Sequence, residues 1–240
     1  MTNPNRHPFD LPVDGVADRY WKMKDLMTCA RTCIRKKEWM TAKNILEEAV
    51  KANHLPAKLE LARFLARTPE LGFPGKERYL RAERLYREVL NVPELPDSMM
   101  AEAALGLGRL YGDYLARPVG CLAMLLMAQR YGADVSQREV ELISHKISRM
   151  DVNSFGGNRQ DAYDLGLELA MTGKSTRTAE LFLREAAASA SPAMAGHAYL
   201  ALAELYRRDM NQYPEHGKEA VRCANAAAEK GFPEYLCFIR

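Results

Sequence analysis

Apolar residues recur at helical spacing along almost the whole chain. Segments such as AELFLREAAASA (179–190) and AVRCANAAAEKG (220–231) place alanine and larger apolar side chains three and four positions apart, which is typical of one helix face. No run alternates apolar and polar residues as a β-strand would. Proline, glycine and asparagine interrupt the pattern at short intervals, as in NVPELPDS and NQYPEHG. The sequence therefore predicts an all-α fold of about a dozen helices.

Two spacing patterns alternate, which predicts five helix pairs. In the first helix of each pair, a starting residue is followed by characteristic residues at +4, +5 and +8, the +5 residue being small. These sets are Asp25, Cys29, Ala30, Cys33; Ala57, Leu61, Ala62, Leu65; Ala103, Leu107, Gly108, Tyr111; Asp161, Leu165, Gly166, Leu169; and Ala198, Leu202, Ala203, Tyr206. The second helix has its own spacing at 0, +7, +8 and +11, and its sets start at Ala42, Ala82, Cys121, Ala179 and Ala220.

The repeat array is irregular, since its first helices start 32, 46, 58 and 37 residues apart. The 58-residue gap contains an additional helix near 136–150 and the glycine-rich connection VNSFGGNRQ. A single pair cannot bury its apolar stripe alone and needs its neighbours to do so. We therefore expect a right-handed α-solenoid of about five helix-turn-helix repeats over residues 18–240, in one domain, preceded by an N-terminal arm over residues 1–17.

The small-xxx-Leu-Gly-xx-Tyr helix, followed by Ala-xxxxxx-Ala-Ala-xx-Gly, resembles the Sel-one-like repeat, a relative of the tetratricopeptide repeat. The resemblance covers most of residues 20–232 and is best in the third and fifth copies, for example KEAVRCANAAAEKG (218–231). The first two copies lack the Leu-Gly pair. Proteins that resemble this class often act in bacterial signalling, secretion, envelope assembly or host interaction, so the resemblance implies a protein-binding adaptor or scaffold.

Three closely spaced glycines, Gly106, Gly108 and Gly112, raise the question of a phosphate-binding loop. Such a loop needs a strand before it and a helix starting after it, whereas the preceding segment SMMAEAA is itself helical. The spacing also differs from the dinucleotide and Walker motifs. Gly108 instead falls on the small position of the repeat, where it would let two helices approach closely.

The candidate chemistry is sparse. The five histidines are scattered and form no metal-binding motif, and no nucleophile elbow is present. Cys29 and Cys33 lie one helical turn apart, but no further ligands accompany them, and we expect the five cysteines to be small buried residues. The sequence therefore predicts neither an enzyme nor a cofactor or metal site. An effector or enzyme complex that uses the repeats as a platform stays open as an alternative.

Charge and composition limit the classes of partner that are expected for this chain. The net charge is only +3, which does not favour the chain as a nucleic-acid or membrane binder. The N-terminus has no apolar run of the secretory kind, and no stretch is long and apolar enough to span a membrane, so we expect a cytoplasmic protein. The partner is then expected to be another protein.

Arginines mark the candidate binding residues. In related helix-pair repeats, positions two, and then five or six, after the large anchor line a concave groove. Six arginines fall on these positions: Arg31, Arg63 and Arg109 at two, and Arg35, Arg67 and Arg208 at six. A guanidinium group offers a planar fork for carboxylates, which predicts that they bind an acidic peptide segment. Two alternatives stay open: ordinary solvated charges paired with nearby glutamates, and a helical-repeat nucleic-acid binder.

Overall fold

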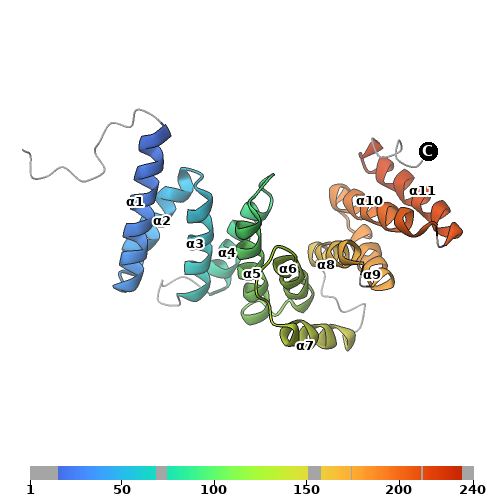
Figure 1. Ribbon diagram of the computed structural model, residues 1–240, viewed down its shortest axis with the longest axis horizontal. Helices are drawn as coiled ribbons and strands as arrows, with labels where there is room; N and C mark the ends of the chain where they lie inside the picture. Colours follow the sequence, from blue (N-terminus) through green and yellow to red (C-terminus); the bar gives the residue numbers. More distant parts are fainter. Residues whose placement is uncertain (1–15, 69–74, 151–157, 174, 212, 234–240) are drawn as a thin grey trace, which may run out of the picture. The chain divides into compact units, whose positions relative to one another are not determined.

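The computed structural model describes residues 16–68, 75–150, 158–173, 175–211 and 213–233, with side chains from residue 24 onward. Within these ranges it is entirely helical, which confirms the predicted fold class (Figure 1). The helices are α1 (Val16–Arg35), α2 (Trp39–Lys51), α3 (Leu55–Arg67), α4 (Gly75–Leu90), α5 (Asp97–Asp113), α6 (Pro118–Arg130), α7 (Gln137–Ser148), α8 (Arg159–Thr172), α9 (Thr176–Ala187), α10 (Pro192–Asp209) and α11 (Pro214–Glu229).

The chain forms two compact units, Met1–Pro96 with α1–α4 and Asp97–Arg240 with α5–α11. Within them, the most extensive packing joins α1 to α2, α3 to α4, α5 to α6, α8 to α9 and α10 to α11. These are the five pairs expected from the sequence. The predicted arm, residues 1–17, lies outside the described residues except for the first two residues of α1. A single repeat domain over 18–240 stays a prediction.

Small residues lie where helices meet. The 0 and +7 positions of the second helices are all at most 3% exposed: Ala42, Ala49, Ala82, Val89, Cys121, Ala128, Ala179, Ala186, Ala220 and Ala227. The small +5 positions of the first helices are buried as well. At Gly108 of α5, an added Cβ would lie 3.2 Å from the Leu125 side chain and 3.3 Å from that of Met124 on α6. Gly108 is therefore a helix-packing residue, as predicted.

The +11 position of the second helices has a conformational role in three copies. Asn53, Gly132 and Gly231 have φ values of 57°, 86° and 101°, in the left-handed region. A residue in this conformation ends a helix, and glycine and asparagine adopt it most readily. The recurring spacing thus includes the point at which the chain turns toward the next pair.

The first copy departs from the expected pattern. The buried stripe of α1 runs through Leu26, Met27 and Ala30, while Cys29 is exposed and Cys33 is half-buried. The expectation that the cysteines are buried is therefore wrong for Cys29. The helical register explains the difference, because the stripe is centred on residues 26, 27 and 30 and leaves position 29 on the solvent side.

The additional helix stands outside the pairing. It is α7, within the range expected from the sequence, and it packs on α6. The same α6 also packs directly against α8, so the third and fourth pairs adjoin each other past the insertion. The chain therefore accommodates α7 without interrupting the contact between successive pairs.

Two arginine–carboxylate pairs join α6 to α8. Arg117 precedes α6, and its Nε donates to Oδ2 of Asp161 at 2.7 Å. Arg130 ends α6, and it donates to both carboxylate oxygens of Glu168, at 3.0 and 2.8 Å. Both acidic residues are buried. Two-point pairing of this kind fixes orientation as well as distance, so both ends of α6 are tied to α8.

Candidate functional site

Four of the six predicted arginines lie on two first helices of the unit Met1–Pro96. Arg31 and Arg35 are one turn apart on α1, and Arg63 and Arg67 are one turn apart on α3, so each pair shares a helix face. Arg31, Arg35 and Arg67 are exposed, and Arg63 is half-buried. These four residues are called the α1–α3 arginine surface below.

Glu60 brings the two helices' arginines together. Its Oε2 lies 3.3 Å from Nη1 of Arg63 on its own helix and 4.0 Å from Nη2 of Arg31 on α1. The Glu60 side chain is only 16% exposed, whereas that of Arg31 is 61% exposed. The carboxylate therefore lies beneath Arg31, and the guanidinium group of Arg31 faces solvent.

Few acidic side chains accompany the arginine surface on its own two helices. On the side chains described for α1 and α3, the acidic residues are Asp25 and Glu60. Two contacts toward the second helices pair a cation with a carboxylate on a neighbouring helix. Lys58 of α3 lies 2.9 Å from Glu88 of α4, and Arg81 of α4 lies 2.7 Å from Glu47 of α2. Among the side chains described on α1 and α3, basic residues thus outnumber acidic ones.

The other two predicted arginines belong to the unit Asp97–Arg240. Arg109 is exposed on α5. Arg208 of α10 donates to Glu204 at 3.0 Å, and Arg207 donates to the same carboxylate at 2.8 Å. These hydrogen bonds lower the pKa of Glu204, with the bond from Arg207 the main cause. Arg208 thus matches the alternative interpretation, a helix charge paired with a nearby glutamate.

No known protein family, curated protein or solved structure matches this chain. Its function must therefore be inferred from the geometry and charge of its own residues. Among the described residues, no group of three or more histidine, cysteine and acidic side chains could hold a metal ion. No described helix is long and apolar enough to cross a membrane.

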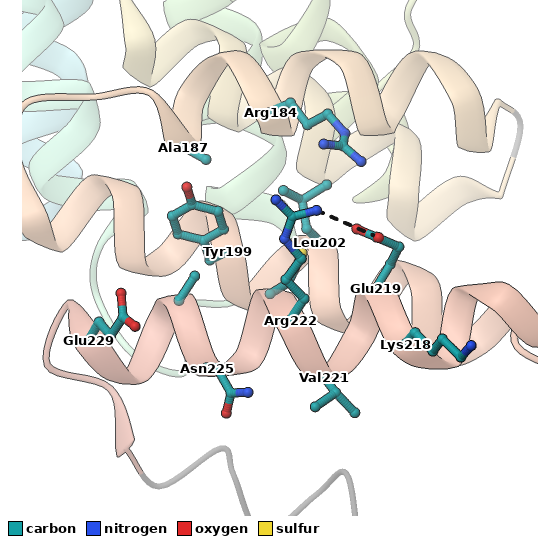
Figure 2. A pocket seen from close by; sticks show the side chains of 12 residues that line it. Arg184, Ala187, Tyr199, Leu202, Lys218, Glu219, Val221, Arg222, Asn225 and Glu229 are labelled. Atoms are coloured by element: carbon teal, nitrogen blue, oxygen red, sulfur yellow. Dashed lines mark ion pairs between the residues drawn. The ribbon is translucent and has the colours of Figure 1, made fainter.

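Sequence reasoning missed a groove of about 630 Å³ between α9, α10 and α11. Arg184 from α9, Tyr199 from α10 and Arg222 from α11 face it (Figure 2). The repeat pattern does not indicate this groove, because it predicts binding positions on first helices, whereas most of this lining comes from α11. Its charges are mixed, with Lys218 and the two arginines set against Glu219 and Glu229.

Arg184 is already engaged at one edge of this groove. Its Nε donates to Glu180 at 2.8 Å, and its Nη2 donates to the Tyr206 hydroxyl at 2.8 Å. That hydroxyl donates in turn to Glu180 at 2.7 Å. Burial, together with the hydrogen bond to Glu180, raises the pKa of Tyr206. The three side chains therefore form a closed network that fastens α9 to α10.

The cysteines should differ sharply in reactivity. Burial raises the pKa of the Cys121 thiol to about 12 and that of Cys223 to about 11, so both stay protonated and shielded near neutral pH. Cys29 is exposed. We expect iodoacetamide at pH 8 to alkylate Cys29 in the native protein, and Cys121 and Cys223 only in urea, as read by peptide mass spectrometry. Rapid native alkylation of Cys121 would contradict the described packing.

Proposed function

We propose that this chain is a non-catalytic helical-repeat adaptor or scaffold of the Sel-one-like type, and that it binds an acidic segment of another protein. The α1–α3 arginine surface is the proposed binding site. One observation carries the proposal: Glu60 contacts both Arg31 and Arg63, so arginines from two successive first helices lie side by side.

The spacing of the arginines suits an extended peptide. Residues one turn apart on a helix are separated by about 6 Å along its axis. Alternate residues of an extended chain advance by a similar distance, about 6.6 Å. Acidic side chains at alternate positions of a peptide can therefore reach successive arginines such as Arg31 and Arg35, and each guanidinium group can form two parallel hydrogen bonds with a carboxylate.

Glu60 serves as a built-in competitor for the incoming carboxylate. Exposed ion pairs in water typically contribute about 0–1 kcal/mol, so an acidic peptide can displace Glu60 from Arg31 at little cost. A bound peptide would then replace one carboxylate with several. Removing the Glu60 charge should accordingly strengthen peptide binding.

The test is fluorescence anisotropy with a labelled peptide of alternating glutamate and glycine. The double variant Arg31→Glu with Arg63→Glu is expected to weaken binding by about tenfold or more, because attraction becomes repulsion at two adjacent positions. Glu60→Gln is expected to tighten it. The matched control, Arg177→Glu with Lys218→Glu, makes the same charge change at exposed sites of the other unit and should preserve affinity within about twofold.

Two results would count against this function. Equal loss in the arginine-surface variant and in its control would mean that only overall charge attracts the peptide. Tight binding of single-stranded DNA that falls steeply with salt and resists competition by the peptide would favour the nucleic-acid alternative.

A further inference from the structure

We propose a second binding site beside the inserted helix α7, for a short peptide segment in which a bulky apolar side chain is followed by acidic residues. This site lies in the unit Asp97–Arg240 and does not depend on the α1–α3 arginine surface. It is a groove of about 490 Å³ bounded by the end of α5, the start of α6 and α7. It is called the α7 groove below.

The wall of the groove is apolar and open to a ligand. Val140 and Ile147 of α7 are buried, which fixes the helix, and Leu142 and Ile143 line the groove. Leu142 is 70% exposed, more than any other exposed large apolar side chain in the described ranges. A leucine so placed gains free energy only when something covers it.

The floor of the groove is small and uncharged. Gly112 and Cys121 line it, and a Cβ on Gly112 would come within 3.1 Å of the Cys121 sulfur atom. The glycine therefore lets α5 pack closely on Cys121, with no side chain of its own at this position. Since burial keeps the Cys121 thiol protonated, the floor presents no charge to a ligand. An apolar side chain is the occupant that this floor and wall accommodate best.

The rim of the groove is basic. Its charged lining residues are Arg117, Lys146 and Arg149, accompanied by His145, and none of the lining residues is acidic. Asp161 already pairs with Arg117, which leaves the exposed side chains of Lys146 and Arg149 to face a ligand. The groove between α9 and α11, by contrast, contains two glutamates among its cations. The basic rim therefore favours a ligand that carries carboxylates next to its apolar side chain.

Nearby carboxylates do not reverse this charge. Asp113 and Glu139 act on Cys121 electrostatically, and Lys146 opposes them, but neither acid is part of the groove lining. The ligand chemistry is therefore specific: an apolar side chain over Cys121 and Leu142, and carboxylates toward Lys146 and Arg149. The insertion α7 supplies one wall and much of the rim of this site.

The test uses three labelled peptides and the full chain in the Arg31→Glu and Arg63→Glu background, which removes the first site. The probes are acetyl-Gly-Glu-Leu-Phe-Glu-Glu-Gly-amide, the same peptide with glutamine for glutamate, and the same peptide with glycine for leucine and phenylalanine. Only the first is expected to bind well, with each of the others weaker by about tenfold, because each lacks one half of the recognised chemistry.

Variants of exposed residues locate the binding. Lys146→Glu with Arg149→Glu should weaken the first peptide by about tenfold, and Leu142→Ala by about threefold. The matched controls are Arg177→Glu with Lys218→Glu, and Leu181→Ala, an exposed leucine on α9. They should leave affinity within about twofold. Methyl NMR signals of Ile143 should shift on binding while those of Leu181 stay unchanged.

Several results would overturn the α7 groove as this site. They are no binding of the first peptide, equal binding of all three peptides, or equal loss in the Lys146 and Arg149 variant and its control. Laurate binding that shifts Ile143 while no peptide does so would assign the groove to a fatty acid instead. Every measurement on the α7 groove is made in a variant that lacks the arginine surface. A negative result for the groove therefore does not affect the proposed function, and a negative result for the arginine surface does not affect the groove.

Discussion

Replacing Arg130 with methionine is expected to lower the free energy of unfolding of the unit Asp97–Arg240 by about 3–5 kcal/mol. The Glu168 side chain is only 1% exposed and receives two hydrogen bonds from Arg130. Methionine keeps much of the side-chain volume but removes the charge, which leaves a buried carboxylate without its partner. The measurement is urea unfolding followed by circular dichroism at pH 7.

The loss in this variant should depend on pH. A buried carboxylate without its partner has a folded-state pKa above its unfolded value, which is about 4.3 for glutamate. At pH values above that raised pKa, the variant shows its full loss in free energy of unfolding. As the pH falls through it toward 4.3, the folded state takes up the proton first, so this loss shrinks. The difference in stability between Arg130→Met and the unmodified protein should therefore be smaller at pH 5 than at pH 7.

Two control variants separate this effect from general loss of an arginine. Arg138→Met removes an exposed arginine of α7 and should change stability by less than about 0.5 kcal/mol. Arg130→Met combined with Glu168→Met replaces the whole pair with apolar side chains and should recover much of the loss. A pH-independent loss that the second substitution does not recover would mean that the pair does not join α6 to α8.

Gly166→Ala is expected to cost about 2 kcal/mol, while Gly108→Ala should be nearly neutral. At Gly166 of α8, an added Cβ would lie 2.8 Å from Cγ and 3.0 Å from the backbone nitrogen of Leu183 on α9. A backbone atom cannot yield without moving the helix, and overpacking of this kind typically costs about 1–3 kcal/mol. Contact with a backbone atom places the overpacking cost near the upper end of that range. Alanine has a better helix propensity than glycine by about 1 kcal/mol, and this gain offsets only part of the cost.

Gly108 provides the internal comparison, because it occupies the same repeat position. Its added Cβ would meet side-chain atoms only, at 3.2 Å and beyond, and the end of the Leu125 side chain can move. The gain in helix propensity should then roughly balance the crowding. Chemical unfolding of both variants checks the contrast. Equal effects would mean that the distance between paired helices is not set by this position.

The helix pairs could be predicted from the sequence because their signal is local and repeated. Small residues at fixed spacings mark the faces that touch, and every second-helix set placed its 0 and +7 residues in a buried position. The first copy is the exception, since its apolar residues are few and its repeat spacing places the exposed Cys29 in the stripe. Periodicity fixes a helix face only where enough apolar residues define it.

The buried ion pairs could not be predicted from periodicity, because their partners are 38 and 44 residues apart. Asp161 occupies a starting position where three other copies have alanine, and Gly120 lies against it, with an added Cβ only 2.7 Å from the Asp161 carboxyl carbon. A buried acid opposite a glycine is a spatial coincidence that becomes visible only once α6 and α8 are placed together.

The candidate site was predictable in part. Repeat positions located the arginines of α1 and α3, but they gave no indication that Glu60 would lie between Arg31 and Arg63. They also did not show that Arg63 would pair with Glu60 on its own helix, as Arg208 pairs with Glu204. Pairing depends on side chains elsewhere on the helix surface, and the spacing of the arginines alone does not report it.

The most direct measurement of the central claim is an NMR titration of the arginine Nε–Hε signals with the alternating glutamate–glycine peptide. The signals of Arg31, Arg35, Arg63 and Arg67 are expected to shift together with one dissociation constant, while that of Arg130, held by Glu168, stays unchanged. Shifts confined to other arginines, or spread evenly over all of them including Arg130, would contradict an acidic-segment site on α1 and α3.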